Sequence, residues 1–179
     1  MRKSAVAMSC QEMILEQTLE IAGISFLIKS PVPFCDPDPD KAYSGFLRSG
    51  SPDTICDVAV RIVIGPPPAC GDRIRFDAEP GWQVLSYGET TRFRSANIAA
   101  DGNPSWTANI SGSNAVIYTG KPAGELVNPM RYPLDQFFLT RILADRGGCI
   151  VHSAGIESHG RGIMLCGVSG AGKTTISRL

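Results

Sequence analysis

The first half of the chain shows the alternation of apolar and polar residues that is typical of half-buried β-strands. In the clearest case, residues 55–64, one face would carry five apolar side chains: Cys56, Val58, Val60, Ile62 and Ile64. Asp57 and Arg61 lie between them and would point to the other side. This pattern predicts a strand over 55–64 with one face in a hydrophobic core.

Two β-hairpins are expected farther along this half of the chain. Each consists of two short strand-like runs separated by turn residues. The paired runs are 82–87 with 91–94, and 106–110 with 115–119. Another alternating run, 73–77, follows the Pro-rich segment 65–72, which cannot continue a sheet interior because proline lacks an N–H group. Residues 1–128 are therefore expected to form a β-rich N-terminal region.

The beginning of this region is predicted to hold one helix, one strand and a loop. Residues 10–20 indicate a short helix, and residues 21–29 indicate an early strand. Residues 31–40 read PVPFCDPDPD, and their prolines predict a loop.

The pattern changes near residue 128, where a helical period replaces the alternation. Residues 134–146 place apolar side chains three and four positions apart, Pro133 suits the first helical turn, and Gly147-Gly148 would end the helix. The elements expected after it are a strand at 149–156, a turn at 158–162 and a short strand of buried type at 163–166. Residues 129–179 are thus expected to begin a second domain, which makes the predicted fold class α/β or α+β.

Residues 167–175 read GVSGAGKTT and fit the phosphate-binding loop pattern G-x-x-x-x-G-K-[ST]. Glycines allow positive φ and a close approach of the backbone, so successive N–H groups can turn toward phosphate oxygens. Lys173 would reach the β- and γ-phosphates of a nucleotide, and the Thr174 hydroxyl would be a ligand of Mg²⁺. The alternative is an ordinary Gly-rich turn. The residues expected to contact the nucleotide are Gly167, Val168, Ser169, Gly170, Ala171, Gly172, Lys173, Thr174 and Thr175.

The overall composition restricts the function classes without selecting one. The 179 residues include 17 basic and 17 acidic side chains, so the chain has no excess of positive charge that would favour nucleic acid or an anionic membrane as a partner. No apolar run approaches the roughly 20 residues of a transmembrane helix, and the first residues do not form a secretory signal. The six cysteines are irregularly spaced, without a CxxC pair. A cytoplasmic protein is expected, and homo-oligomeric assembly is left open.

In its context, the loop resembles one kinase family. The stretch VHSAGIESHGRGIMLCGVSGAGKTT, residues 151–175, is similar to HPr kinase/phosphorylase and its relatives with a PEP-carboxykinase-like P-loop fold. The likeness rests on two features: a P-loop that follows a Gly-rich hairpin, and a histidine, His152, that precedes the P-loop lysine, Lys173, by the same number of residues as in the family. The resemblance extends over about residues 130–179. The resemblance implies transfer of the ATP γ-phosphoryl group, with Mg²⁺, to a hydroxyl such as a serine of a protein or peptide. It also implies that His152 and Lys173 are catalytic.

Other interpretations stay open beside this one. His152 taken alone would be a buried strand histidine satisfied by a hydrogen bond. The chain would also suit a nucleotide-responsive binding module without catalysis, a small-molecule kinase or a PEP-carboxykinase-like enzyme. The family's catalytic aspartate and acidic Mg²⁺ ligand would lie beyond Leu179. We therefore expect this chain to be an N-terminal portion of a longer protein, with an incomplete P-loop domain and little activity of its own.

Overall fold

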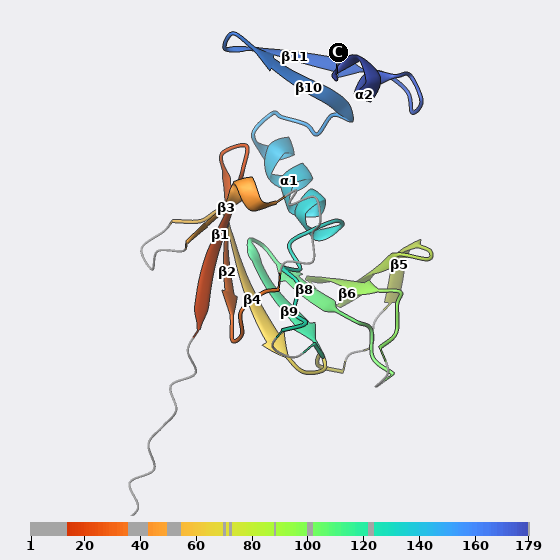
Figure 1. The fold of residues 1–179 in the computed structure, drawn as a ribbon. Helices are drawn as coiled ribbons and strands as arrows, with labels where there is room; N and C mark the ends of the chain where they lie inside the picture. The colour runs from red at the N-terminus through yellow and green to blue at the C-terminus, as the bar shows by residue number, and fades with distance from the viewer. Residues whose placement is uncertain are drawn as a thin grey trace, which may run out of the picture. The chain divides into compact units, whose positions relative to one another are not determined.

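The computed structural model describes most of the chain (Figure 1). The chain divides into two compact units between Gln136 and Phe137. The described residues are 14–35, 43–49, 55–69, 71, 73–87, 89–99, 102–121 and 124–178.

In the described part of the first unit, nine strands form one mixed sheet in the order β3-β1-β2-β4-β9-β8-β7-β6-β5. Neighbouring strands are antiparallel except for β2–β4 and β4–β9, which are parallel. A 3₁₀ turn, Ser44–Phe46, precedes β3. The strands are β1 (Leu15–Ile21), β2 (Ile24–Ser30), β3 (Leu47–Ser49), β4 (Val58–Ile64), β5 (Arg73–Ala78), β6 (Trp82–Tyr87), β7 (Thr90–Ser95), β8 (Thr107–Ser111) and β9 (Asn114–Thr119).

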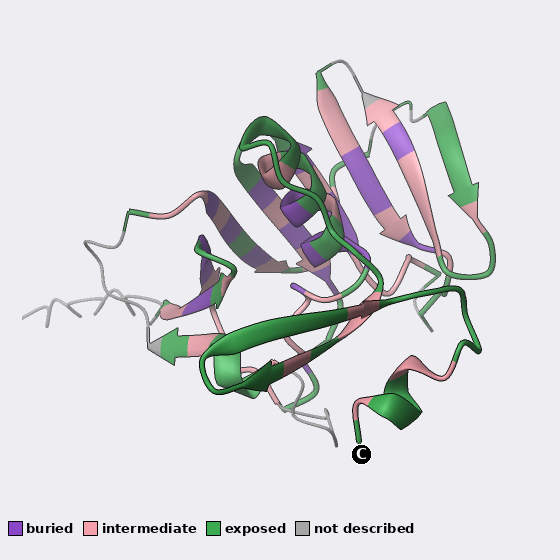
Figure 2. Ribbon diagram, turned by 90° about the horizontal axis from the view of Figure 1, so that it is seen from above, coloured by how far each residue is buried: buried purple, intermediate pink, exposed green. Residues whose placement is uncertain are grey.

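The core follows one face of this sheet, and β4 shows why the alternation predicted it. Val58, Val60 and Ile62 are buried, and Arg61 between them is exposed. The predicted strand is thus confirmed, although it begins at Val58, and Ile64 at its end is 40% exposed. The register continues the same face into the neighbouring strands, where the buried side chains are Leu19, Phe26, Ile28, Phe93, Ala108 and Ile117. Figure 2 shows the alternation of buried and less buried residues along these strands.

Both expected hairpins are confirmed. β6 pairs with β7 in antiparallel register, with Val84 opposite Phe93, and β8 pairs with β9, with Ala108 opposite Ile117. The run at 73–77 also forms a strand, β5, which lies at one edge of the sheet and has exposed residues from 73 to 77. The expectation of a β-rich N-terminal region is therefore confirmed.

The expected helix at 10–20 is wrong, because residues 15–21 form β1; residues 10–13 lie outside the described part. The expected early strand at 21–29 is confirmed as β2, but it begins only at Ile24, because the chain reverses at Ala22 and Gly23, whose φ angles are +52° and +72°. Two consecutive positive φ values are typical of the tight hairpin turns that match the strand twist. β1 and β2 are therefore the two arms of a hairpin, with Ile21 opposite Ile24. In the predicted loop 31–40, only 31–35 are described, and Cys35 makes an isolated bridge to Val127.

The predicted helix at 134–146 is confirmed as α1 (Leu134–Asp145). Its end is a glycine cap, as predicted. Gly147 has a φ of +73°, its N–H donates to the Ala144 carbonyl (3.2 Å), and the Gly148 N–H donates to the Leu143 carbonyl (2.6 Å). No described helix has both the length and the apolar character that crossing a membrane would need.

The rest of the second unit is an antiparallel hairpin followed by a short helix. The hairpin strands are β10 (Ser153–Ser158) and β11 (Arg161–Cys166), joined at His159 and Gly160, and they pair only with each other among the described strands. The predicted strand at 149–156 thus begins later, and the predicted turn at 158–162 is narrower. The expectation of a buried strand at 163–166 is wrong, because Ile163 and Met164 are 50% and 60% exposed (Figure 2). A two-stranded sheet cannot bury both faces, so an apolar sequence alone does not ensure burial here.

Candidate functional site

The predicted phosphate-binding loop joins β11 to the helix α2 (Lys173–Ile176) in the second unit. The loop is at the surface, because residues 167–171 are exposed and Gly172 and Lys173 are half-buried. Gly172 is the residue before α2 and has left-handed φ and ψ of +76° and +14°. The predicted order of strand, loop and helix is therefore confirmed around the motif.

The glycines of the loop are required for two different physical reasons. Gly170 and Gly172 have φ of +82° and +76°, which side-chain-bearing residues rarely adopt, although the space around each is open. At Gly167 the limit is contact, because an added Cβ would lie 3.2 Å from the Ala171 Cβ. The loop therefore closes on itself at Gly167 and turns at Gly170 and Gly172.

Lys173 extends from the first residue of α2 back across the loop. Its Nζ donates hydrogen bonds to the carbonyl oxygens of Gly167 (2.8 Å) and Val168 (3.0 Å). Its side-chain carbons Cδ and Cγ lie near Gly167, at 3.9 and 4.0 Å from where a Cβ would stand there. The ammonium charge is thus held at the start of the loop by backbone carbonyls.

Several backbone donors of the loop have no acceptor in the described part of the chain. Within the loop, the Ala171 N–H donates to the Val168 carbonyl at 3.2 Å. The N–H groups of Ser169, Gly170 and Gly172 donate to no described residue. Exposed backbone N–H groups beside a cation are the donor set that phosphate oxygens bind.

Thr174 and Thr175 are exposed on the first turn of α2. The Thr174 carbonyl accepts from the Ser177 hydroxyl (3.0 Å), and no hydrogen bond joins the Thr174 hydroxyl to another described residue. No group of three or more His, Cys, Asp or Glu side chains suited to a metal ion occurs among the described residues. An oxygen ligand of the Thr174 type fits Mg²⁺, which keeps several waters and binds to one or two protein oxygens and to substrate phosphates.

His152 lies just before β10, not within the strand as predicted, and it is exposed. The hairpin register pairs Ser153 with Cys166, so His152 and Gly167 flank the same end of the hairpin. α2 also lies against β10. Because His152 is exposed, the alternative of a buried strand histidine is wrong.

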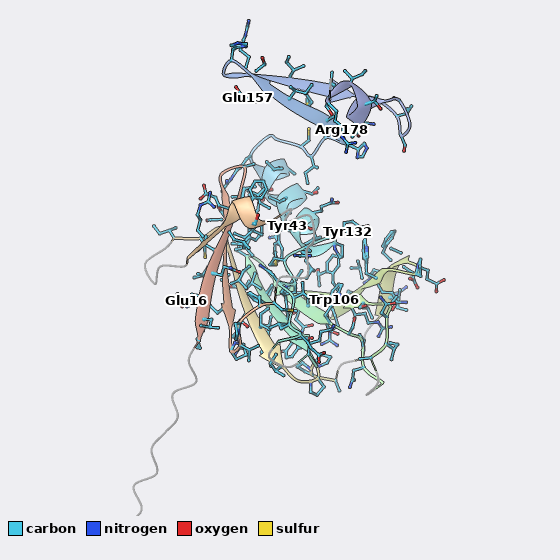
Figure 3. All side chains as sticks on the ribbon, in the orientation of Figure 1. Glu16, Tyr43, Trp106, Tyr132, Glu157 and Arg178 are labelled. Atoms are coloured by element: carbon cyan, nitrogen blue, oxygen red, sulfur yellow. The ribbon has the colours of Figure 1, made fainter. Side chains whose placement is uncertain are left out.

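The other end of the hairpin carries the second histidine, His159. It lies in the turn with a φ of +53°, and its Nδ1 is 3.0 Å from the Ser158 hydroxyl. Glu157 accepts from the Gly160 N–H at 2.7 Å at this end, whereas Arg178 follows α2 at the loop end (Figure 3). The structure therefore separates His159 from the loop and brings His152 to it.

Comparisons with protein-family models, with curated proteins and with solved structures found no match to this chain.

Proposed function

We propose that residues 167–175 bind the phosphates of ATP, and that the protein is a kinase of the HPr-kinase-like type with a PEP-carboxykinase-like P-loop domain. The observation that carries this proposal is the position of Lys173, whose ammonium group lies across the start of a loop with unpartnered backbone N–H groups. A charge and several donors fixed in one small loop match a polyphosphate, because charge-assisted hydrogen bonds are the strong ones.

Each residue type has a specific task in this proposal. The N–H groups of Ser169, Gly170 and Gly172 donate to phosphate oxygens, and Lys173 exchanges its two carbonyl acceptors for the β- and γ-phosphates. Thr174 supplies a hydroxyl oxygen to Mg²⁺, which neutralises charge on the phosphates when bound. Catalysis by such a loop consists of positioning and charge stabilisation.

His152 is assigned to the transferred phosphoryl group. The pairing of Ser153 with Cys166 supports this assignment, because it fixes the residue before β10 at the end of the hairpin from which the loop begins. A protonated imidazole there would stabilise negative charge on the phosphoryl oxygens. The acceptor in this proposal is a hydroxyl, such as a serine of a protein or peptide.

Calorimetric titration with MgATP tests the nucleotide site. Lys173→Ala removes a charge-assisted contact of about 1.5–3 kcal/mol, so the affinity should fall by roughly tenfold to more than a hundredfold. Lys121→Ala is the control, because it removes the same charge from an exposed lysine of the first unit. Equal affinity of the wild-type and Lys173→Ala proteins would refute the proposal.

A second arm of the same experiment separates binding from transfer. His152→Ala should bind MgATP with unchanged affinity, because the loop residues are intact. Transfer of γ-labelled phosphate to serine peptides should fall in this variant. Equal transfer by the wild-type and His152→Ala proteins would refute the role of His152.

A further inference from the structure

The first unit contains a cavity of about 210 Å³ that plays no part in the proposed nucleotide site. It lies between the segment 126–133, the residues just before β8 and the strand β9, and every described residue that lines it belongs to the first unit. The residues that matter for its chemistry are Trp106, Ile117, Lys121, Asn128, Arg131 and Tyr132.

The walls of the cavity are mostly apolar and include aromatic and proline rings. Trp106 is half-buried, Ile117 is fully buried, and the rings of Pro129 and Pro133 also line the space. Two contacts with Trp82 position the Tyr132 side chain. The Tyr132 hydroxyl accepts a hydrogen bond from the Trp82 indole N–H at 3.3 Å, and the two rings meet edge to face with centroids 6.3 Å apart. Aromatic and proline rings are good contact surfaces for a planar ligand.

The charge of the cavity has one sign. Lys121 and Arg131 both line it, and no Asp or Glu is among its described lining residues. Lys121 lines the cavity and is exposed to solvent. The guanidinium carbon of Arg131 lies 5.4 Å from the centre of the Tyr43 ring, which lines a neighbouring hollow with Arg131 and is not among the described residues of this cavity. The positive charge of Lys121 favours an anionic ligand.

The segment that forms one wall is fixed before any ligand arrives. The Asn128 side-chain oxygen accepts from the Met130 N–H (2.9 Å), and Met130 is fully buried. On the opposite wall, the Thr119 hydroxyl donates to the Ser105 carbonyl (3.2 Å) and accepts from the Lys121 N–H (3.2 Å). A preformed cavity with a few polar groups is the usual form of a small-molecule site.

We infer that this cavity binds a small organic anion with a flat apolar body, of the aromatic carboxylate class. The volume equals about seven waters of liquid, which suits a single ring with one carboxylate. The ring would lie among Trp106, Tyr132 and the prolines, and the carboxylate would face Lys121.

Benzoate is the probe, and the signal is the indole N–H resonance of Trp106 in the spectrum of the ¹⁵N-labelled protein. A ligand of about nine non-hydrogen atoms should bind with a Kd on the order of 1 mM. Benzoate should shift the Trp106 resonance more than the Trp82 resonance. Lys121→Ala should weaken the binding at least fivefold, whereas Lys173→Ala, a matched change in the other unit, should leave it unchanged.

Each alternative outcome overturns the inference. If benzamide binds as tightly as benzoate, the negative charge of the ligand does not contribute to binding. If inorganic phosphate binds as tightly as benzoate, the aromatic ring does not contribute. No saturable shift with benzoate up to 20-fold above the expected Kd would remove the site itself. Because Lys121 and Lys173 lie in different units, failure here leaves the nucleotide proposal intact, and failure of that proposal leaves this one intact.

Discussion

Ile28 allows a direct test of the sheet core, because the same substitution at Ile74 is a matched control. Ile28 lies in β2, between β1 and β4, and is fully buried. Ile74 lies in the edge strand β5 and is 48% exposed. Replacement by alanine removes the same three carbon atoms at both positions, so any difference between the two variants comes from the surroundings.

The expected loss at each position follows from its burial. Three buried carbons at about 0.8 kcal/mol each correspond to roughly 2.4 kcal/mol of transfer free energy at Ile28. The cavity left in a packed core brings such losses to about 2–5 kcal/mol. At Ile74 about half of the side chain is already in water, so the transfer loss is roughly 1.2 kcal/mol, and an edge site leaves no closed cavity.

Urea unfolding followed by tryptophan fluorescence measures both losses. Trp82 and Trp106 are the two tryptophans of the chain, and both lie in the first unit, so the signal reports this unit. With a slope of about 2 kcal/mol/M, Ile28→Ala should lower the unfolding midpoint by at least about 1 M, and Ile74→Ala by about half as much. Equal shifts would mean that β2 is not at the centre of the core, and the proposed arrangement of the sheet would be refuted.

Two other substitutions test a buried carboxylate and the loop conformation. Tyr43→Phe removes the hydroxyl that donates to the Asp135 carboxylate, which is 5% exposed, so the free energy of unfolding should fall by about 1–3 kcal/mol in the same urea assay. Tyr132→Phe, at a 63% exposed tyrosine, should lose less, and an equal loss would contradict the argument. Gly170→Ala places a side chain at a φ of +82°, a strain of about 1–2 kcal/mol, and should weaken MgATP binding in calorimetry. Gly45→Ala, at a site with open space, should bind MgATP as the wild type does. Normal MgATP binding by both variants would mean that nucleotide binding does not depend on the left-handed conformation of Gly170.

The elements that could be predicted from the sequence are those with a local physical signal. The alternation around Val60 was sufficient because one face of β4 is buried, and Gly147 marked the end of α1 because only a left-handed residue makes that cap. The strand β1 was predicted as a helix because its Leu, Glu and Gln residues have high helix propensity. Its pairing with β2 and β3 overrides that propensity, and the turn at Ala22 was not recognised.

The candidate site shows the same division between local and long-range information. The sequence located the loop, because the motif specifies residue types at fixed positions. It did not indicate that Lys173 bonds back to Gly167 and Val168, since that depends on how the loop curls. The cavity beside Trp106 had no sequence signal at all, because its walls come from three separate segments that only the fold brings together.

The hairpin also changes how the spacing between His152 and Lys173 should be interpreted. Six residues of β10 pair with six of β11, from Ser153 opposite Cys166 to Ser158 opposite Arg161. An antiparallel hairpin of any length returns the chain to its starting end, so a longer or shorter one would still place the residue before β10 beside the residue after β11. The physical link between His152 and the loop is therefore the strand pairing, and the number of residues between them follows from the length of the hairpin. A histidine at another distance from a P-loop lysine would have the same relation to the loop, provided that it directly precedes the first strand of such a hairpin.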